Sequence, residues 1–581
     1  NNKNVLKRLL IYTKPYLIYI IFAVISALIS VSMTLYTPVL IGNAIDHIIG
    51  KGNVNFSSIT PILIKLVCVV ILSAFFTWIM AVCTNKITYN TIRDIRNDLY
   101  NKIGLLPLSY IDRTPHGEII SRITVDAEQI SDGMLQGFNQ FLTGIITIIG
   151  TIFFMLNINV KIALVVIILT PLSLFVATFI TKISHNKFAE QSRVRGELSG
   201  LIEEIMNGAK VVRAFSYENR SQEKFEEINS RLYKCGVLSQ FYSALANPST
   251  RFINGLVYAA VGIFGSLSII SGTSAMTIGQ IAAFLSYANQ YTKPFNEITG
   301  VITELQSAFA SARRIFDVID SEEEISDENN IEISSSDGSI KISDVSFSYI
   351  SDIPLIKNMN LAVKKGQRIA IVGPTGCGKT TVINLLMRFY DVNSGSICID
   401  KDMIDIRNIK RDNLRSLYGM VLQDTWIFTG TVKENIAYGK PNASDDEIIN
   451  AAKMSYAHSF IKRLPNGYDT VLTKDGDNLS EGQKQLLSIS RIMLVNPPML
   501  ILDEATSNID TRTEQNVQRA FVKLMQGKTC FVIAHRLSTI IDSDVILVMR
   551  DGDIIEQGSH DELLQKQEFY YKLFNAQFEQ V

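Results

Sequence analysis

The sequence predicts a multi-domain protein in which an all-α transmembrane domain of six helices, with long cytosolic helical extensions, precedes an α/β domain. Apolar residues are concentrated before about residue 320, and 47% of the 581 residues are hydrophobic. After an acidic, polar linker, short apolar runs of strand type alternate with helical stretches, which is typical of an α/β domain with parallel strands. We therefore place the domains at 1–320 and 338–581, with the linker at 321–337.

Six stretches before residue 320 are apolar enough to cross a bilayer as helices. A membrane helix needs about 20 consecutive apolar residues. None of the six shows the amphipathic stripe of a helix packed in a soluble protein. The predicted transmembrane helices are 15–42, 59–84, 134–157, 159–182, 246–272 and 278–300.

The connections between these segments differ in length and in charge. The short ones carry at most one Lys, whereas two long connections, 85–133 and 183–245, are rich in Lys and Arg. An excess of Lys and Arg near helix ends places the long connections and both chain ends in the cytoplasm. The first ten residues lack the small-residue cleavage site of a signal peptide, so we interpret them as a cytosolic lead-in.

The two long connections also carry apolar residues at helical spacing, so they are expected to continue the helices into the cytosol as hairpins. Each hairpin has a helix-breaking signal at its tip, near 107–117 and near 214–222. These tips are candidate coupling loops that dock on the second domain.

Composition excludes some classes of partner. The formal net charge is −1, so no basic field favours binding to nucleic acid. The six cysteines are scattered, without the spacing of a metal site, and we interpret them as reduced, unpaired thiols.

A phosphate-binding loop lies between the apolar strand Ile369–Val372 and a predicted helix over 380–389. Its sequence fits the pattern G-x-x-x-x-G-K-[ST], in which glycines let backbone N–H groups turn onto phosphate oxygens. Lys379 reaches the β- and γ-phosphates, and the Thr380 hydroxyl suits Mg²⁺. The residues expected at ATP in this segment are Gly373, Pro374, Thr375, Gly376, Cys377, Gly378, Lys379, Thr380 and Thr381.

Four further residues belong to the predicted ATP site. The apolar run Met499–Leu502 ends in Asp503, which suits an Mg²⁺ ligand through water, and Glu504, which is placed to polarise the attacking water. The alternative for this pair is a capping role. Gln423 is expected to bind Mg²⁺ and sense the γ-phosphate. Tyr349, about 25 residues before the loop, is expected to stack on adenine, unless it is an ordinary strand aromatic.

These motifs together resemble ABC transporters in order and spacing, over nearly the whole chain. Six membrane segments fused ahead of one P-loop ATPase domain of the ABC type are similar to an exporter half-transporter. The resemblance implies that His535 contacts the γ-phosphate and orients Glu504. It also implies that two halves dimerise, each ATP lying between one chain's phosphate loop and the other's signature loop. The signature loop is Leu479, Ser480, Glu481, Gly482 and Gln483, and the D-loop includes Ser507, Asn508 and Asp510.

Three departures from the family pattern bear on the partner. Glu481 and Leu486 stand where the family usually has Gly and Arg, and the segment 471–476 is altered too. A carboxylate about 4 Å from a phosphate costs ~4 kcal/mol at an effective dielectric of ~20. We therefore expect a heterodimer, resembling the catalytically competent subunit of bacterial multidrug exporters, whose partner has a standard signature and a degenerate catalytic Glu. Alternatively, Glu481 faces solvent and the chain forms a homodimer.

Cargo is expected to be hydrophobic or amphiphilic and to cross a bacterial-type cytoplasmic membrane, with the ATPase in the cytosol. Polar residues inside a membrane segment are functional candidates, although helix packing explains each of them equally well. Peptide export and lipid flipping use the same motifs and stay open, as does a regulatory ATP-binding subunit. The cargo candidates in the sixth segment are Tyr287, Asn289, Gln290, Lys293 and Glu297, of which the last two are spaced to pair.

Overall fold

The chain divides into two compact units, which are considered separately. One comprises Asn1–Leu105 and Thr114–Glu322, and the other Leu106–Arg113 and Glu323–Val581. The computed structural model describes residues 2–48, 54–270, 276–328, 330–333, 335–350, 353–422, 425–473, 476–503, 511–533 and 540–578.

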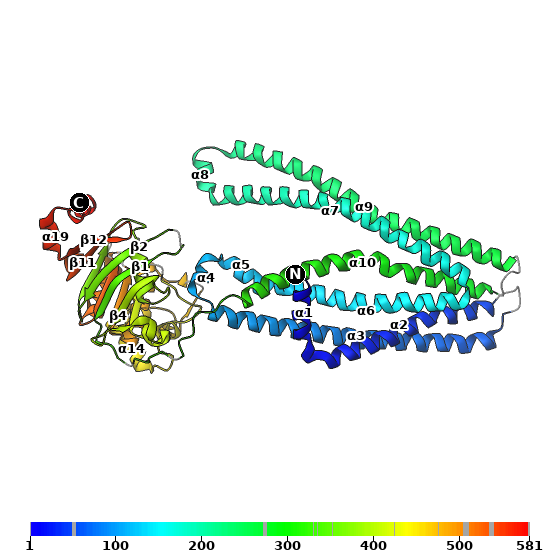
Figure 1. The fold of residues 1–581 in the computed structure, drawn as a ribbon, viewed down its shortest axis with the longest axis horizontal. Coiled ribbons are helices and arrows are strands. Elements are labelled where there is room, and N and C mark those ends of the chain that lie inside the picture. The colour runs from blue at the N-terminus through cyan, green and yellow to red at the C-terminus, as the bar shows by residue number, and fades with distance from the viewer. Residues whose placement is uncertain are drawn as a thin grey trace. The chain divides into compact units, whose positions relative to one another are not determined.

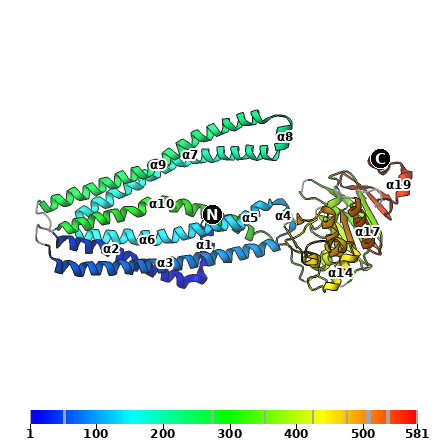
Figure 2. The same cartoon turned by 180° about the vertical axis from the view of Figure 1, so that it is seen from behind.

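The first unit is entirely helical in its described residues (Figure 1). Helices α7 and α9 lie side by side and are joined by the short α8, and this pair diverges from the other long helices towards α8 (Figures 1 and 2). Helix α2 packs on α3, and α10 packs on α6 and α2. The helices are α1 (Asn2–Thr13), η1 (Lys14–Tyr16), α2 (Leu17–Asp46), α3 (Phe56–Leu105), α5 (His116–Ser121), η2 (Arg122–Asp126), α6 (Ala127–Ile158), α7 (Val160–Asn207), α8 (Ala209–Ala214), α9 (Glu218–Ile270) and α10 (Ile278–Ile319).

Five helical stretches in the described part of the chain are long and apolar enough to cross a membrane. They are Asn4–Asp46, Phe56–Leu105, His116–Ile158, Val160–Asn207 and Glu218–Ile270. The sixth predicted segment, 278–300, forms the first half of α10 but does not reach the same apolarity, because Asn289, Gln290 and Lys293 interrupt it. The count of six apolar helices is therefore corrected to five, with α10 as a more polar helix of the same unit.

The predicted extension of the helices beyond the length of a membrane span is confirmed. Helices α3, α7 and α9 contain 50, 48 and 53 residues. At about 1.5 Å per residue each is roughly 70–80 Å long, far more than the ~30 Å that the hydrocarbon core requires.

Small and hydroxylated residues join the helices of this unit. The Ser30 hydroxyl lies 2.6 Å from that of Thr77 and 3.4 Å from that of Ser73, which links α2 to α3. Gly42 and Gly279 approach so closely that a Cβ on Gly279 would lie 2.0 Å from the Gly42 carbonyl oxygen. Contacts of this kind are the ones that hold helices together where no hydrophobic force acts between them.

The second unit has the predicted α/β architecture and contains two main sheets. The six-stranded sheet has the order β12-β11-β3-β10-β9-β6, with only β12 antiparallel, and the four-stranded sheet has the antiparallel order β2-β1-β4-β5. The strands are β1 (Ile340–Phe347), β2 (Ile356–Val363), β3 (Arg368–Val372), β4 (Ser394–Ile399), β5 (Ile404–Asp405), β6 (Tyr418–Val421), β7 (Gly430–Thr431), β8 (Val471–Leu472), β9 (Met499–Asp503), β10 (Thr529–Ile533), β11 (Val545–Arg550) and β12 (Asp553–Gly558).

Both faces of the six-stranded sheet are buried, which is why its strands are continuous apolar runs. Along β3, Ile369 and Ile371 enter a core shared with the four-stranded sheet and α11, while Ala370 and Val372 face a core built on α14, α16 and α17. The helices are α4 (Leu108–Arg113), α11 (Lys379–Leu386), η3 (Ile406–Asn408), α12 (Arg411–Ser416), α13 (Val432–Ala437), α14 (Asp445–Met454), α15 (His458–Ile461), η4 (Gly467–Asp469), α16 (Glu481–Val495), α17 (Thr511–Met525), α19 (His560–Lys566) and α20 (Phe569–Phe578).

The acidic segment between the domains is fastened to the second unit. Arg411, whose side chain is only 7% exposed, lies 3.1 Å from a Glu324 carboxylate oxygen and donates to the Ile325 carbonyl at 2.6 Å. Its backbone N–H donates to Asp327, and this bond lowers the pKa of that carboxyl. The acidic composition that predicts a linker therefore also provides ligands for a buried guanidinium.

We predict that Arg411→Met loosens this segment. The substitution removes a buried cation that several carboxylates and a carbonyl share, so the segment opens more often and cleavage by a glutamate-specific protease after Glu322 or Glu323 accelerates about tenfold. Limited proteolysis followed by mass spectrometry measures this rate. Lys433→Met, which removes an exposed ion pair with Asp445, is the matched control and should leave the rate unchanged. Equal cleavage in the two variants would contradict the prediction.

Candidate functional site

The phosphate loop is built as its sequence predicts. It follows β3 and leads into α11, and three of its glycines have positive φ: Gly373 (153°), Gly376 (83°) and Gly378 (101°). The Lys379 ammonium donates to the Gly373 carbonyl at 2.8 Å and to the Pro374 carbonyl at 3.0 Å. The cation is thus held over the loop, where the charge of a phosphate would lie.

Gly373 is required by packing as well as by its φ angle. A Cβ at this position would lie 2.2 Å from the Met549 carbonyl oxygen of β11 and 2.9 Å from the Cys377 sulfur. Any side chain here pushes the loop away from the sheet. The predicted helix over 380–389 is shorter in the structure: α11 ends at Leu386, and Arg388 adopts a left-handed conformation with φ 49°.

The parallel strands bring the predicted chemistry to one edge of the sheet. Ile533, the last residue of β10, is in register with Ile371 of β3 and with Asp503 at the end of β9. Asp503 thus lies level with Ile371, and the phosphate loop begins two residues further on, after Val372. Polar oxygens of Asp503 and of Thr380, in the first turn of α11, are donors that Mg²⁺ prefers, so the described residues fit this ion.

Several predicted site residues lie outside the described residues. Gln423, Glu504 and His535 follow the described ends of β6, β9 and β10, respectively. The D-loop residues Ser507, Asn508 and Asp510 also lie outside the described ranges.

Tyr349 lies beside the phosphate-loop helix. Its hydroxyl accepts from the Asn384 amide at 3.0 Å and lies 3.3 Å from the Thr381 hydroxyl. Its ring meets those of Phe347 and Tyr390 edge-on, with both centroid distances 4.9 Å. The position of Tyr349 suits an adenine platform next to α11, and sequence reasoning missed Tyr390, whose ring packs against that of Tyr349.

The signature loop ends in a well-capped helix. The Ser480 hydroxyl accepts from the Gln483 backbone N–H and the Gln483 side chain accepts from that of Ser480, so the two form a capping box at the start of α16. Leu479 and Gly482 are buried. Leu486, where the family usually has Arg, is also buried in the core, so its side chain lies away from any nucleotide.

Glu481 is the first residue of α16, and its side chain is 57% exposed. Its carboxylate pairs with the Lys484 ammonium at 2.8 Å, one helical turn along. Sequence reasoning considered Glu481 as an isolated charge and missed this cation, although a glutamate three residues before a lysine on a helix indicates such a pair. The pair reduces the electrostatic cost predicted for a phosphate at this loop, but an exposed pair contributes at most about 1 kcal/mol.

The cargo candidates on α10 have different environments. Tyr287 is fully buried: its hydroxyl donates to the Leu35 carbonyl at 2.6 Å and its ring stacks on Phe154. The structure therefore gives Tyr287 a packing role instead of the predicted contact with cargo. Asn289 is exposed and Gln290 partly so.

An apolar groove lies between α6 and α10, and Glu297 reaches it. Lys293, with a side chain 74% exposed, lies 4.0 Å from the Glu297 carboxylate, as their spacing indicates. The groove was not predicted from the sequence, since its walls come from helices far apart in the chain. Its lining consists of Gln140, Phe141, Gly144, Ile145, Ile148, Pro294, Phe295, Glu297 and Val301.

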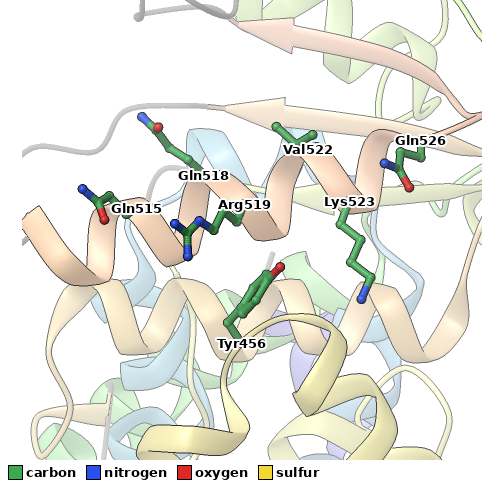
Figure 3. A pocket seen from close by; sticks show the side chains of 7 residues that line it. All are labelled: Tyr456, Gln515, Gln518, Arg519, Val522, Lys523 and Gln526. Carbon is green, nitrogen blue, oxygen red and sulfur yellow. The ribbon is translucent and has the colours of Figure 1, made fainter.

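A separate surface pocket lies along α17 (Figure 3). Its lining is mostly polar and includes two cations, Arg519 and Lys523, with Tyr456 opposite the helix. No predicted site residue lines this pocket.

Comparison with known proteins decides the family. Residues 20–295 match the family described as ABC transporter transmembrane region, and residues 356–507 match the family described as ABC transporter. A Bacillus subtilis protein, named uncharacterized ABC transporter ATP-binding protein YfiC, is 41% identical over 581 residues, which is 100% of this chain and 95% of the relative. The chain belongs to the ABC transporters.

Other comparisons define the type of transporter. The fatty acid ABC transporter ATP-binding/permease protein of Mycobacterium bovis is 41% identical over 527 residues, covering 91% of this chain and 83% of that protein. The structure of a bacterial Atm1-family ABC exporter with ATP bound matches with a TM-score of 0.76 and 28% identity, over 96% of this chain and 98% of that chain. The transporter is thus an exporter half with membrane and ATPase domains fused in one multi-pass chain, and it couples ATP hydrolysis to transport.

We predict that Gly373→Ala abolishes ATP binding and lowers the free energy of unfolding of the ATPase domain by at least about 3 kcal/mol, because the new Cβ overlaps a backbone carbonyl. Gly376→Ala is the matched control, since Gly376 also has positive φ but open space around it. It should cost only about 1 kcal/mol. Thermal unfolding and binding of a fluorescent ATP analogue measure both effects. Similar losses in the two variants would refute the role assigned to packing.

Proposed function

We propose that the transporter exports hydrophobic or amphiphilic compounds of the multidrug type across the cytoplasmic membrane by alternating access, as the catalytically competent half of a heterodimer. The observation that carries the unlike partner is Glu481 at the first position of α16, because a carboxylate occupies the helix N-terminus that a phosphate would approach. A homodimer would repeat this charge in both ATP sites.

In the proposed cycle, the phosphate loop binds ATP and Lys379 leaves its two carbonyl partners for the β- and γ-phosphates. Thr380, Asp503 and Gln423 would hold Mg²⁺, which when bound would supply positive charge that offsets the charge of the phosphates. Glu504 polarises the attacking water, and His535 orients Glu504 and contacts the γ-phosphate. The signature loop of the partner covers this nucleotide, whereas Leu479–Gln483 cover the partner's site, which hydrolyses poorly.

Nucleotide binding drives transport only through a difference in affinity between two conformations. Each ATP bridges two ATPase domains and thus favours their closed arrangement. The hairpin tips at α4 and α8 transmit the closure to the membrane helices. Phe215, next to α8, is 78% exposed, as expected for an apolar side chain that becomes buried when α8 docks on another domain.

The groove between α6 and α10 supports an amphiphilic cargo. Its walls are mainly aliphatic and aromatic, with polar groups confined to Gln140 and Glu297. Sites of this composition bury apolar bodies and orient one polar group. The similarity to a fatty acid transporter favours a second candidate, an amphiphilic lipid, and the same groove serves it. Stimulation of ATP turnover by hydrophobic cations, fatty acids or peptides separates the candidates.

We predict that the purified chain alone hydrolyses ATP at least about tenfold more slowly than the same chain co-purified with a second half-transporter, encoded by a neighbouring reading frame, that has Gly in its signature and no Glu after its magnesium-binding Asp. Steady-state turnover in lipid nanodiscs measures the difference. Glu504→Gln in the two-component protein should reduce turnover by at least about 10²-fold. Equal turnover of the single chain would exclude an obligatory unlike partner.

Replacement of Glu481 distinguishes the two kinds of dimer independently. In the heterodimer, Glu481→Gly alters the poorly active site, so turnover at saturating ATP changes less than about twofold. In a homodimer, the same change relieves both working sites and raises turnover about tenfold or more. Glu481→Gln, which removes the charge but keeps the size, controls for the change of shape. A large gain with both variants would favour the homodimer over our proposal.

A further inference from the structure

We propose that Tyr390 and Asp112 are a positioning pair that links the adenine-binding tyrosine to the tip of the first cytosolic hairpin, so that nucleotide binding at Tyr349 sets the docking of α4. This inference rests on the proposed function, in which Tyr349 contacts adenine. Neither Tyr390 nor Asp112 belongs to the motifs that identify the ATP site.

Helix α4 is joined to the ATPase fold by hydrogen bonds. The segment Leu106–Arg113 belongs to the same compact unit as the ATPase fold, although it is flanked on both sides by helices of the other unit. Tyr390 donates its phenolic proton to an Asp112 carboxylate oxygen at 2.6 Å. Arg113 donates from its guanidinium to the Tyr349 carbonyl oxygen, also at 2.6 Å. Both are bonds to ionised groups, which are the strong class of hydrogen bond.

The rings of Tyr349 and Tyr390 pack against each other. Tyr349 and Tyr390 meet at 4.9 Å with an interplanar angle of 90°, and Phe347 touches both of them. Edge-to-face packing of this kind fixes the relative orientation of aromatic rings. A tilt of Tyr349 when adenine stacks on it would therefore displace the ring of Tyr390.

Tyr349 is also linked to the phosphate-loop helix. The hydroxyl of Tyr349 contacts Asn384 and Thr381, both on α11, whose first residue is Lys379. The hydroxyl of Tyr349 thus contacts the phosphate-loop helix, and its carbonyl oxygen accepts from Arg113 of α4. Its ring packs on Tyr390, which in turn donates to Asp112 of α4. Each contact lies within one compact unit of the chain.

Tyr390 is well supported for this role. Arg388, two residues earlier, is 5% exposed, and its guanidinium donates to Asp391 and to the carbonyls of Ile406 and Ile409. The backbone on both sides of Tyr390 is therefore fixed, so motion of the ring is transmitted to Asp112 instead of being absorbed locally. Burial and the bond to Asp112 raise the pKa of Tyr390, so the phenol keeps its proton at neutral pH.

The alternative is that the pair merely anchors α4. A purely structural anchor lowers stability when it is removed, but leaves the relation between ATP binding and membrane-helix movement unchanged. An experiment that measures binding and movement separately distinguishes the two roles.

The test uses the complete transporter in lipid nanodiscs with Tyr390→Phe, Asp112→Asn and the double variant. Binding of a fluorescent ATP analogue is measured beside the distance between spin labels at Ser57 and Val160, at the loop-proximal ends of α3 and α7. We expect each variant to bind within about twofold of the original affinity, while the ATP concentration for half of the distance change rises about tenfold. The double variant should match either single one, because both remove the same bond.

The controls are Tyr571→Phe and Asp402→Asn, at exposed positions of the same domain, and they should leave both measurements unchanged. The inference is overturned if the variants show the same ATP dependence of the distance change as the original protein, or if ATP binding and the distance change weaken equally. It is also overturned if the effects of the two substitutions add in the double variant, or if Tyr390→Phe unfolds. If the unsubstituted transporter shows no ATP-driven distance change, the proposed function fails instead, so the two failures are distinguishable.

Discussion

The register of the parallel strands, which brings their carboxyl ends to one edge of the sheet, is the constraint on which the rest of the ATPase domain depends. Because Ile533 at the end of β10 is in register with Ile371 of β3 and with Asp503 of β9, the phosphate loop and a carboxylate lie at one edge of the sheet. The approach of Gly373 to the Met549 carbonyl then sets how closely the phosphate loop can follow that edge. Neither feature tolerates a shift of one residue, since a register slip would move each side chain of the slipped strand into the core on the other face of the sheet.

The membrane unit obeys a different constraint, which explains its length and its polar contacts. Backbone groups in the bilayer must be satisfied within the helix, so the chain crosses as uninterrupted helices. Helix α10 is not among the five apolar spans, and it compensates by burying Tyr287 against α2 and α6 and by the close approach of Gly279 to Gly42. Of its polar residues, Tyr287 thus packs between helices, whereas Glu297 lines the groove between α6 and α10.

Local patterns were enough to predict five apolar spans, the phosphate loop and the strand that ends at Asp503, because spacing along the chain alone determines them. The role of Tyr287 was not predictable, since burial depends on helices about 130 and 250 residues away. The docking of Asp112 on Tyr390 and the fastening of the linker by Arg411 also join distant segments. The Glu481–Lys484 pair is different: its spacing was visible in the sequence, but only the structure shows that the two side chains meet.

The contact of the ATPase domain with α4 and its contact with the linker both involve one short segment, residues 388–391. This shared segment favours joint action of the two contacts. Residues 388–391 directly follow the phosphate-loop helix; Tyr390 contacts α4, and Asp391 lies 3.6 Å from Arg411, which also binds the linker. If nucleotide binding displaces α11, as the proposed cycle requires, this short segment, which Arg388 fastens by hydrogen bonds, connects the displacement to α4 and to the linker. Packed contacts switch between discrete arrangements instead of deforming gradually, so they amplify small shifts. The segment 388–391 is therefore suited to convert ATP binding into movement of the membrane helices.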